Sequence, residues 1–258
     1  MAYRDLDLTG KTAVVVGGTS GIGRSIALGL AQAGADVIPT SRRNDKVQEV
    51  VGAIEALQRR SLAITADVSD RSSLERLLSA VVAAFGKVEI LVNAAGQIKR
   101  TPTLDSSEIE WRAILDINLM GVLRSCQVFG RHMLDRAYGR IVNITSLNAF
   151  VALHEVAAYA ASKAAVQSLT RSLAIEWANR GVCVNAIAPG VFPTALNSEL
   201  LRTSQRGQEL LMRTPMKRYG SPDELVGAAV LLASDAASFM TGSVIVVDGG
   251  FLASGVNQ

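Results

Sequence analysis

The sequence is poor in cysteine and histidine, and this scarcity excludes several kinds of site. Only two of its 258 residues are cysteines and two are histidines. Cys126 and Cys183 lie far apart and form no Cys-x-x-Cys pair, so we expect buried thiols in a reducing compartment and no disulfide framework. So few ligands also make a dedicated zinc site unexpected, and we predict no metal.

The chain lacks concentrated positive charge. Its formal net charge is +3, and no run of five or more basic residues occurs. The arginine pairs at 42–43 and 59–60 are isolated. A nucleic-acid-binding surface is therefore not expected.

Long apolar runs are absent as well. No segment approaches the roughly 18 apolar residues that a membrane helix needs. The stretch MAYRDLDLTG carries acidic residues where a signal peptide would carry basic ones. We expect no membrane partner and a cytoplasmic location.

Short β-branched runs, most of them followed by longer amphipathic stretches, dominate the sequence. The runs occupy residues 12–16, 35–41, 62–68, 88–93, 139–145, 182–189 and 243–249, and helical patterns cover about 22–33 and 46–59. This alternation predicts a parallel sheet covered by helices on both faces, which is a doubly wound α/β fold. No linker or repeat interrupts the series, so we predict one domain over residues 1–258.

The first predicted strand leads into the glycine-rich stretch GTSGIGRS, where a helix begins. Backbone N–H groups in such a loop favour a phosphate. A P-loop fits at Gly18, Gly23 and Ser25, but Arg24 stands where its lysine belongs. The pattern GxGxxG fails at Ile26. Taken alone, the loop leaves a nucleoside triphosphate, a dinucleotide and a plain turn open.

Tyr159 and Lys163 lie four residues apart in the segment YAASK, so both side chains leave one face of a predicted helix. An ammonium near a phenol lowers the phenol pKa from about 10, which suits tyrosine to proton transfer. Ser146 ends a predicted strand, where its hydroxyl can bond a substrate carbonyl, and Asn118 is a polar residue in an apolar helix. A Tyr–Lys pair alone is common on helix surfaces, but the four residues in this order favour a catalytic site.

These motifs resemble the short-chain dehydrogenase/reductase family over nearly the whole chain. The frame Gly17-x-x-x-Gly21-Ile22-Gly23 is similar to the family's glycine loop, with Val16 in place of the usual threonine. The segment NAAG (93–96) is similar to its Asn-Asn-Ala-Gly motif, with alanine as the second residue. The resemblance implies a seven-stranded Rossmann sheet, and usually a homotetramer.

The resemblance also implies a catalytic tetrad and its roles. Tyr159 would be the general acid in ketone reduction and the base in alcohol oxidation. Lys163 would lower its pKa and hold the nicotinamide ribose. Ser146 would polarise the carbonyl, and Asn118 would order a water that relays the proton.

A nicotinamide dinucleotide is the cofactor that follows. Serine rather than an acidic residue ends the second predicted strand, and two arginines follow it; serine does not repel a 2′-phosphate and arginine can bind one. We therefore expect NADP(H) in preference to NAD(H). The predicted cofactor residues are Gly17, Thr19, Ser20, Gly21, Ile22, Gly23, Ser41, Arg42, Arg43, Asp67, Val68, Asn93, Ala94, Gly96, Tyr159, Lys163, Pro189, Gly190, Phe192 and Thr194.

The segments QIKRTP (97–102) and VDGGFLA look like those of gluconate 5-dehydrogenases and related sugar-acid oxidoreductases. Lys99 and Arg100 are candidates for binding a substrate carboxylate, and the alternative is that they are two solvated loop residues. Phe150, His154 and the segment near Leu196 are expected to line the pocket.

Other substrates and activities stay open at this point. The same pocket would suit a 3-oxoacyl thioester or a small cyclic ketone. A P-loop NTPase is disfavoured by Arg24, and a non-catalytic dinucleotide-binding regulator finds no support in the intact tetrad.

Overall fold

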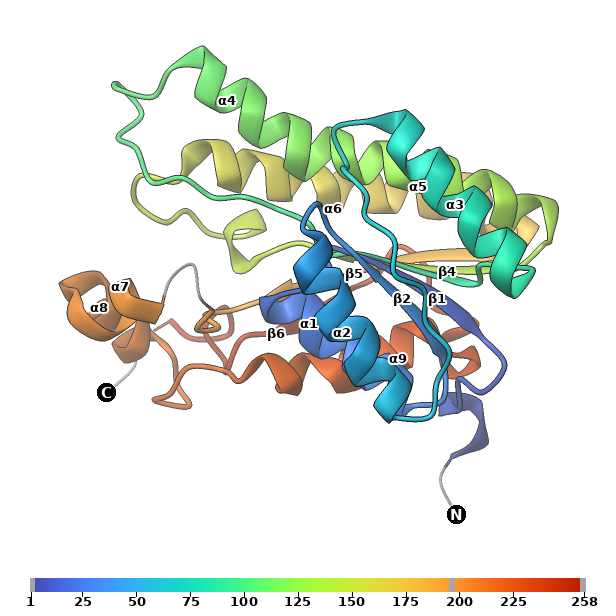
Figure 1. Cartoon of the computed structure of the whole chain (residues 1–258). Helices are drawn as coiled ribbons and strands as arrows, with labels where there is room; N and C mark the ends of the chain where they lie inside the picture. Colours follow the sequence, from blue (N-terminus) through green and yellow to red (C-terminus); the bar gives the residue numbers. More distant parts are fainter. Residues whose placement is uncertain (1–2, 195–197, 256–258) are drawn as a thin grey trace.

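Six parallel strands form one sheet in the computed structural model, which describes residues 3–194 and 198–255 (Figure 1). Their order across the sheet is β2-β1-β3-β4-β5-β6. The order reverses between β1 and β3, and open α/β sheets bind ligands at such a reversal. The strands are β1 (Thr12–Val16), β2 (Asp36–Thr40), β3 (Ile90–Asn93), β4 (Gly139–Ile144), β5 (Val182–Pro189) and β6 (Val244–Val247).

Helices cover both faces of the sheet, as the apolar strands require. In β1, Ala13 and Val15 pack into one core and Val14 and Val16 into the other. Figure 1 shows α1, α2 and α9 on one side and α3, α4, α5 and α6 on the other. The helices are α1 (Gly21–Gln32), α2 (Asn44–Ala56), α3 (Arg71–Phe85), α4 (Glu108–Leu115), α5 (Gly121–Asp135), α6 (Ala157–Trp177), α7 (Ser198–Thr203), α8 (Gln205–Arg213) and α9 (Val226–Ala233).

The predicted seventh strand, at 62–68, does not form, and that part of the prediction is wrong. This segment runs beside β2 with only intermittent bonds: Val37 N–H donates to the Arg60 carbonyl, and Ala66 N–H donates to the Ser41 carbonyl, both at 3.1 Å. Alternate residues of β2 face this segment, so Pro39 lies between Val37 and Ser41 on that side. Pro39 has no N–H to donate. The ladder is interrupted at its centre, so the sheet ends at β2.

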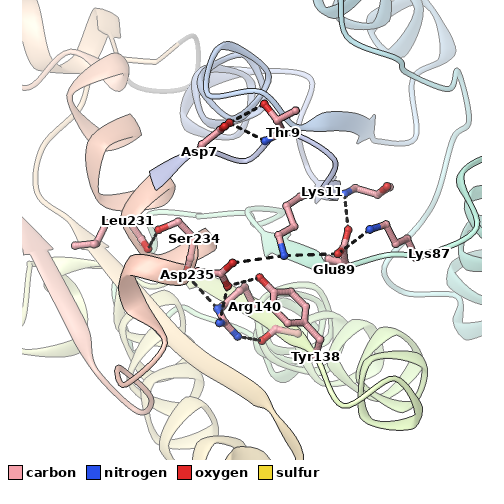
Figure 2. A network of polar contacts seen from close by, with 12 residues as sticks. Asp7, Thr9, Lys11, Lys87, Glu89, Tyr138, Arg140, Leu231, Ser234 and Asp235 are labelled. Atoms are coloured by element: carbon pink, nitrogen blue, oxygen red, sulfur yellow. Dashed lines mark hydrogen bonds and ion pairs between the residues drawn. The ribbon is translucent and has the colours of Figure 1, made fainter. Parts of the chain in front are cut away.

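A charged network, drawn in Figure 2, joins residues at the amino ends of β1, β3 and β4. The glycine loop follows the carboxyl end of β1, so the network and the loop lie at opposite ends of the strands. Lys11 Nζ lies 3.7 Å from the carboxylates of both Glu89 and Asp235. Asp235 also accepts hydrogen bonds from Arg140 at 3.1 Å and from the Tyr138 hydroxyl at 2.8 Å. The network ties the start of β1 to β4 and to the turn after α9. No helix in the described part of the chain is long and apolar enough to cross a membrane.

Candidate active site

A cavity of about 700 Å³ lies where the carboxyl ends of the strands meet. Its volume is in the range of cofactor and substrate sites. Loops that follow β1, β2, β3, β4 and β5 contribute to its wall. Every predicted cofactor residue except Asn93 lies on this wall, and so does Ser146.

The glycine loop after β1 is shaped by close backbone packing. Gly17 has φ +81°, and a Cβ there would lie 2.5 Å from the Ala95 nitrogen. A Cβ at Gly23 would overlap the Gly17 carbonyl oxygen. Both positions therefore need glycine, which keeps the loop backbone at the cavity surface.

Helix α1 begins at this loop without a side-chain cap. Ser20 occupies the N-cap position, but its side chain accepts no bond from the first turn. By contrast, Asp70 and Ser107 cap α3 and α4. The first N–H groups of α1 are left for another acceptor, and together with the helix dipole they fit the pyrophosphate of a dinucleotide.

The end of β2 carries hydroxyls and cations rather than a carboxylate. Ser41 Oγ accepts a hydrogen bond from Thr19 Oγ1 at 2.8 Å, and Arg42 and Arg43 are exposed on the cavity wall. Burial raises the pKa of the nearby Asp67, but hydrogen bonds from Ser69 and the charge of Arg42 outweigh it and the pKa is lowered. This end of the cavity suits a phosphate-bearing ribose.

Tyr159 and Lys163 project from α6 toward the cavity, beside Ser146. Lys163 Nζ lies 5.7 Å from the centre of the Tyr159 ring and donates a hydrogen bond to the Ile144 carbonyl at 2.8 Å. Burial lowers the pKa of Lys163 to about 8. Burial also raises the pKa of Tyr159, and a hydrogen bond with the Ser146 side chain opposes this increase. The pKa of Tyr159 is therefore raised, contrary to the expectation that Lys163 lowers it, because desolvation of the phenol dominates.

Asn118 is fully buried in a π-helical turn, Asp116–Met120, between α4 and α5. Its Oδ1 accepts from Gln97 N–H at 2.8 Å, and its Nδ2 donates to the Gln97 carbonyl at 2.9 Å and to Ser162 Oγ at 3.0 Å. A Cβ at Gly96 would lie 3.4 Å from Asn118 Oδ1 and 3.6 Å from Lys163 Nζ. Asn118 thus holds the loop after β3 close to Lys163. That it orders a relay water stays a prediction.

Asn93 does not lie on the cavity wall, although we predicted it to bind the cofactor. Its Nδ2 donates to Asn143 Oδ1 at 2.9 Å and to Cys126 Sγ at 3.4 Å. Asn143 in turn donates to Thr170 Oγ1 at 3.0 Å. The side chain links β3, β4 and α6 inside the core because the register places Asn93 opposite Asn143.

Of the predicted substrate residues, only Arg100 lies on the wall. Lys99 points to Glu110, with 2.5 Å between Nζ and Oε2. Phe150 is 46% exposed and the His154 side chain 81% exposed, and neither lines the cavity; Leu153 of the same segment does. Leu196 lies outside the described residues.

Sequence reasoning missed several polar wall residues, among them Asn148 and Arg206. Asn148 donates its backbone N–H to Ser146 Oγ at 3.2 Å, and its side-chain nitrogen has no hydrogen-bond partner in the described part of the chain. Arg206 stands at the start of α8, in a stretch without a recognisable motif. Only the fold brings these side chains to the cavity.

Known proteins match the chain over nearly its whole length. A family model described as enoyl-(acyl carrier protein) reductase matches residues 16–252. The 2-dehydro-3-deoxy-D-gluconate 5-dehydrogenase of Dickeya dadantii is 40% identical over 254 residues, which cover 98% of this chain and 100% of that protein. This chain belongs to the short-chain dehydrogenase/reductase family. The predicted resemblance is confirmed.

Solved structures of the same family superpose closely. One, described as an NAD(P)-dependent gluconate 5-dehydrogenase from Beutenbergia cavernae with NADP bound at low occupancy, has a TM-score of 0.92 at 45% identity, covering 97% of this chain and 100% of that one. A gluconate 5-dehydrogenase from Burkholderia cenocepacia, in complex with NADP and tartrate, has a TM-score of 0.93 at 35% identity, covering 97% and 98%. The Rossmann-type α/β fold and the oxidoreductase class of this family member are therefore established.

Proposed function

We propose that this chain is an NADP-dependent oxidoreductase that interconverts a secondary alcohol and a ketone on a sugar acid. The observation that carries the proposal is the single cavity shared by the glycine loop, the cations after β2, and Ser146, Tyr159 and Lys163. Such a cavity holds a cofactor and a small substrate against one another.

The cofactor residues fit a nicotinamide dinucleotide. The uncapped start of α1 offers N–H groups to a pyrophosphate, and the preceding loop is held by Gly17 N–H, which donates to the Thr40 carbonyl at 2.9 Å. Arg42 and Arg43 offer guanidinium groups to a 2′-phosphate, with no carboxylate at the carboxyl end of β2 to repel it. When bound, the cofactor supplies the hydride for ketone reduction and accepts it in alcohol oxidation.

Proton transfer falls to the chain's own residues. Ser146 Oγ accepts a bond from Asn148 N–H, and its hydroxyl, which is hydrogen-bonded to Tyr159, would turn to the substrate oxygen when the substrate binds. Tyr159, beside it, gives its proton to the reduced oxygen or takes it from the alcohol. Lys163, with a pKa of about 8, carries a positive charge near neutral pH and would hold the nicotinamide ribose beside Tyr159. Asn118 positions the loop that faces Lys163.

The substrate class rests on relatives and on the cavity. The Dickeya dadantii protein and both solved structures are named as dehydrogenases of sugar acids, and one of them holds tartrate, a hydroxy acid. Arg100 on the cavity wall provides a cation for a carboxylate.

The test is a substrate panel with purified protein and both cofactors. Sugar acids such as gluconate, neutral polyols of equal length and a 3-oxoacyl thioester are compared by kcat/KM. We expect the highest kcat/KM for a sugar acid with NADP(H). A highest value for the thioester or for a neutral ketone would reject the sugar-acid assignment.

Tyr159→Phe tests the proton-transfer step. Removing the hydroxyl deletes the acid and should lower kcat by about 10²–10⁴-fold. NADPH binding, followed by fluorescence, should stay within about threefold because the glycine loop is untouched. Near-normal turnover in this variant with every active substrate contradicts the mechanism.

Cofactor preference is tested at the end of β2. Arg42→Ala should weaken NADPH about ten- to a hundredfold, since a hydrogen bond to a charged group contributes about 1.5–3 kcal/mol. The affinity for NADH, which has no 2′-phosphate, should change little. Ser41→Asp places a carboxylate against the 2′-phosphate and should strengthen the binding of NADH. If Arg42→Ala weakens the binding of both cofactors equally, Arg42 does not recognise the 2′-phosphate.

We further propose a homotetramer of single-domain subunits, as the family resemblance implies. Strand β6 ends the sheet with apolar residues, and Val246 is 40% exposed. Apolar edge strands are normally covered, and a second copy would do so. Light scattering should give four times the chain mass of 27.2 kDa; a particle of one chain mass contradicts this.

A further inference from the structure

The charges on the cavity wall are divided between its two ends. Arg42, Arg43 and Asp67 lie after β2 or close to it, at the proposed cofactor end, and Lys163 lies beside Tyr159. The remaining charged wall residues are Arg100 and Arg206. In the described residues, no carboxylate side chain shares that part of the wall with them. The charged side chains that face the substrate end are therefore both arginines.

The two arginines come from different parts of the chain. Arg100 lies after β3, and Arg206 stands in the first turn of α8. Burial and the neighbouring Arg100 lower the pKa of Arg206, while the carboxylates of Glu155 and Glu209 oppose them. An anion placed between two guanidinium groups that repel each other lowers their electrostatic energy.

Residues 154 and 155 hold both guanidinium groups from outside the cavity. The Glu155 carboxylate pairs with Arg100 Nε, and the His154 carbonyl accepts from Arg206 NH1 at 2.6 Å. Glu155 has φ +64°, an uncommon conformation for a residue with a side chain, and its carbonyl accepts from Thr101 N–H at 2.9 Å. The turn at residues 154–155 is therefore held by Arg206 at His154 and by Thr101 and Arg100 at Glu155.

The same contacts leave donors unused. Nε and NH2 of Arg206 have no hydrogen-bond acceptor in the part of the chain that is described, and neither do NH1 and NH2 of Arg100. Planar guanidinium groups match carboxylates with two parallel hydrogen bonds. Guanidinium N–H groups without acceptors, on a part of the wall that carries no carboxylate, are typical of an anion-binding site.

We propose that Arg206 binds the carboxylate of the substrate together with Arg100 and is the residue that favours acids over neutral polyols. The inference rests on the proposed function, because it deepens the choice of substrate at the same site. The reacting carbon would lie at Ser146 and Tyr159, and the carboxylate would lie at the arginine end of the one cavity.

The main experiment compares gluconate with glucitol, a neutral polyol of equal length. Arg206→Met should raise KM for gluconate about ten- to a hundredfold, the effect of losing one charge-assisted hydrogen bond. The KM for glucitol should change by less than about threefold, and kcat for gluconate should fall far less than its KM rises. Arg206→Lys, which keeps the charge but not the fork, should fall between wild type and Arg206→Met.

Arg202→Met is the matched control. Arg202 is exposed on α7 and does not line the cavity, so this variant should leave both KM values unchanged. Equal rises for gluconate and glucitol in Arg206→Met, or no rise for either, would overturn the role of Arg206.

Tartrate binding to the NADPH-loaded protein separates this inference from the proposed function, because it needs no turnover. Calorimetry should show binding to wild type that weakens at least tenfold in Arg206→Met. If wild type oxidises no sugar acid but shows this difference, the proposed function fails and the anion site stands. If tartrate binds both proteins equally or binds neither, Arg206 is not an anion-binding residue.

Discussion

Lys163 shows most directly how burial and charge compete at a single residue. It is 5% exposed, and its ammonium has one described hydrogen-bond acceptor, the Ile144 carbonyl. Burial lowers its pKa from 10.5 to about 8. A buried ammonium held in this way reduces the stability of the folded chain, which is common at sites where function requires a buried charge.

The pH dependence of this cost has a defined sign. Below about pH 8 the lysine is charged in both states, and the folded state bears the full cost. Between about pH 8 and 10.5 the folded lysine is neutral while the unfolded one stays charged, so the cost disappears as the pH rises. Lys163→Met should therefore raise the free energy of unfolding by about 1–3 kcal/mol at pH 7.

Urea unfolding of wild type and Lys163→Met at several pH values measures this difference. It should shrink steadily toward pH 10. A difference that stays constant from pH 7 to 10 would show that the lysine does not titrate in the folded chain.

At the scale of elements, β1, its loop and α1 form the unit that we propose binds the cofactor phosphates. Gly23 is buried in α1 against the Gly17 carbonyl, whereas Gly52 in α2 has open space where a Cβ would lie. These two helical glycines therefore provide a test of whether close packing or helix propensity decides the effect of adding one methyl group.

Gly23→Ala should destabilise the chain by about 1–3 kcal/mol, because the loop must shift to remove the overlap. NADPH binding should weaken at least tenfold, since the same loop carries the N–H donors. Gly52→Ala should raise stability by up to about 1 kcal/mol, as alanine favours a helix. Thermal unfolding and NADPH fluorescence titration of both variants check this. Equal NADPH affinity in the two would remove the loop from the cofactor site.

At the scale of the whole molecule, the Asp235 network joins segments far apart in the sequence (Figure 2). Burial raises the pKa of Asp235, but the Tyr138 hydroxyl, Lys11 and Arg140 outweigh it, so the pKa is lowered. The Arg140 side chain is only 6% exposed and depends on this carboxylate. The network therefore stabilises the amino ends of the strands, which are remote from the cavity.

Asp235→Asn should lower the free energy of unfolding at pH 7 by up to about 1 kcal/mol, because a nearly buried guanidinium loses its counterion while solvent screens the half-exposed carboxylate. Because the pKa of Asp235 is lowered on folding, the wild-type advantage should vanish as the pH falls through the folded value. Kinetic constants should stay unchanged, since the network lies at the opposite ends of the strands. Asp105→Asn, at an exposed position, is the control and should have little effect on stability. Equal losses in both variants would contradict the role of the network.

The sequence by itself determined the parts of this protein that depend on local pattern. Runs of β-branched residues predicted six strands that form, because apolar strands buried on both faces have no other place in a folded chain. The spacing of Gly17 and Gly23 predicted the loop, and the spacing of Tyr159 and Lys163 predicted a shared helix face, because both depend on a few neighbouring residues.

Only the tertiary structure decided what depends on distant neighbours. Pro39 ends the sheet because its missing N–H faces the segment after α2, and Asn93 turns into the core because its register places it opposite Asn143. The pKa of Tyr159 follows burial, which no single stretch encodes. Arg206 reaches the cavity because α8 folds back over residues 154–155. Burial, register and contact between remote segments arise only when the chain packs, since each is set by several elements together.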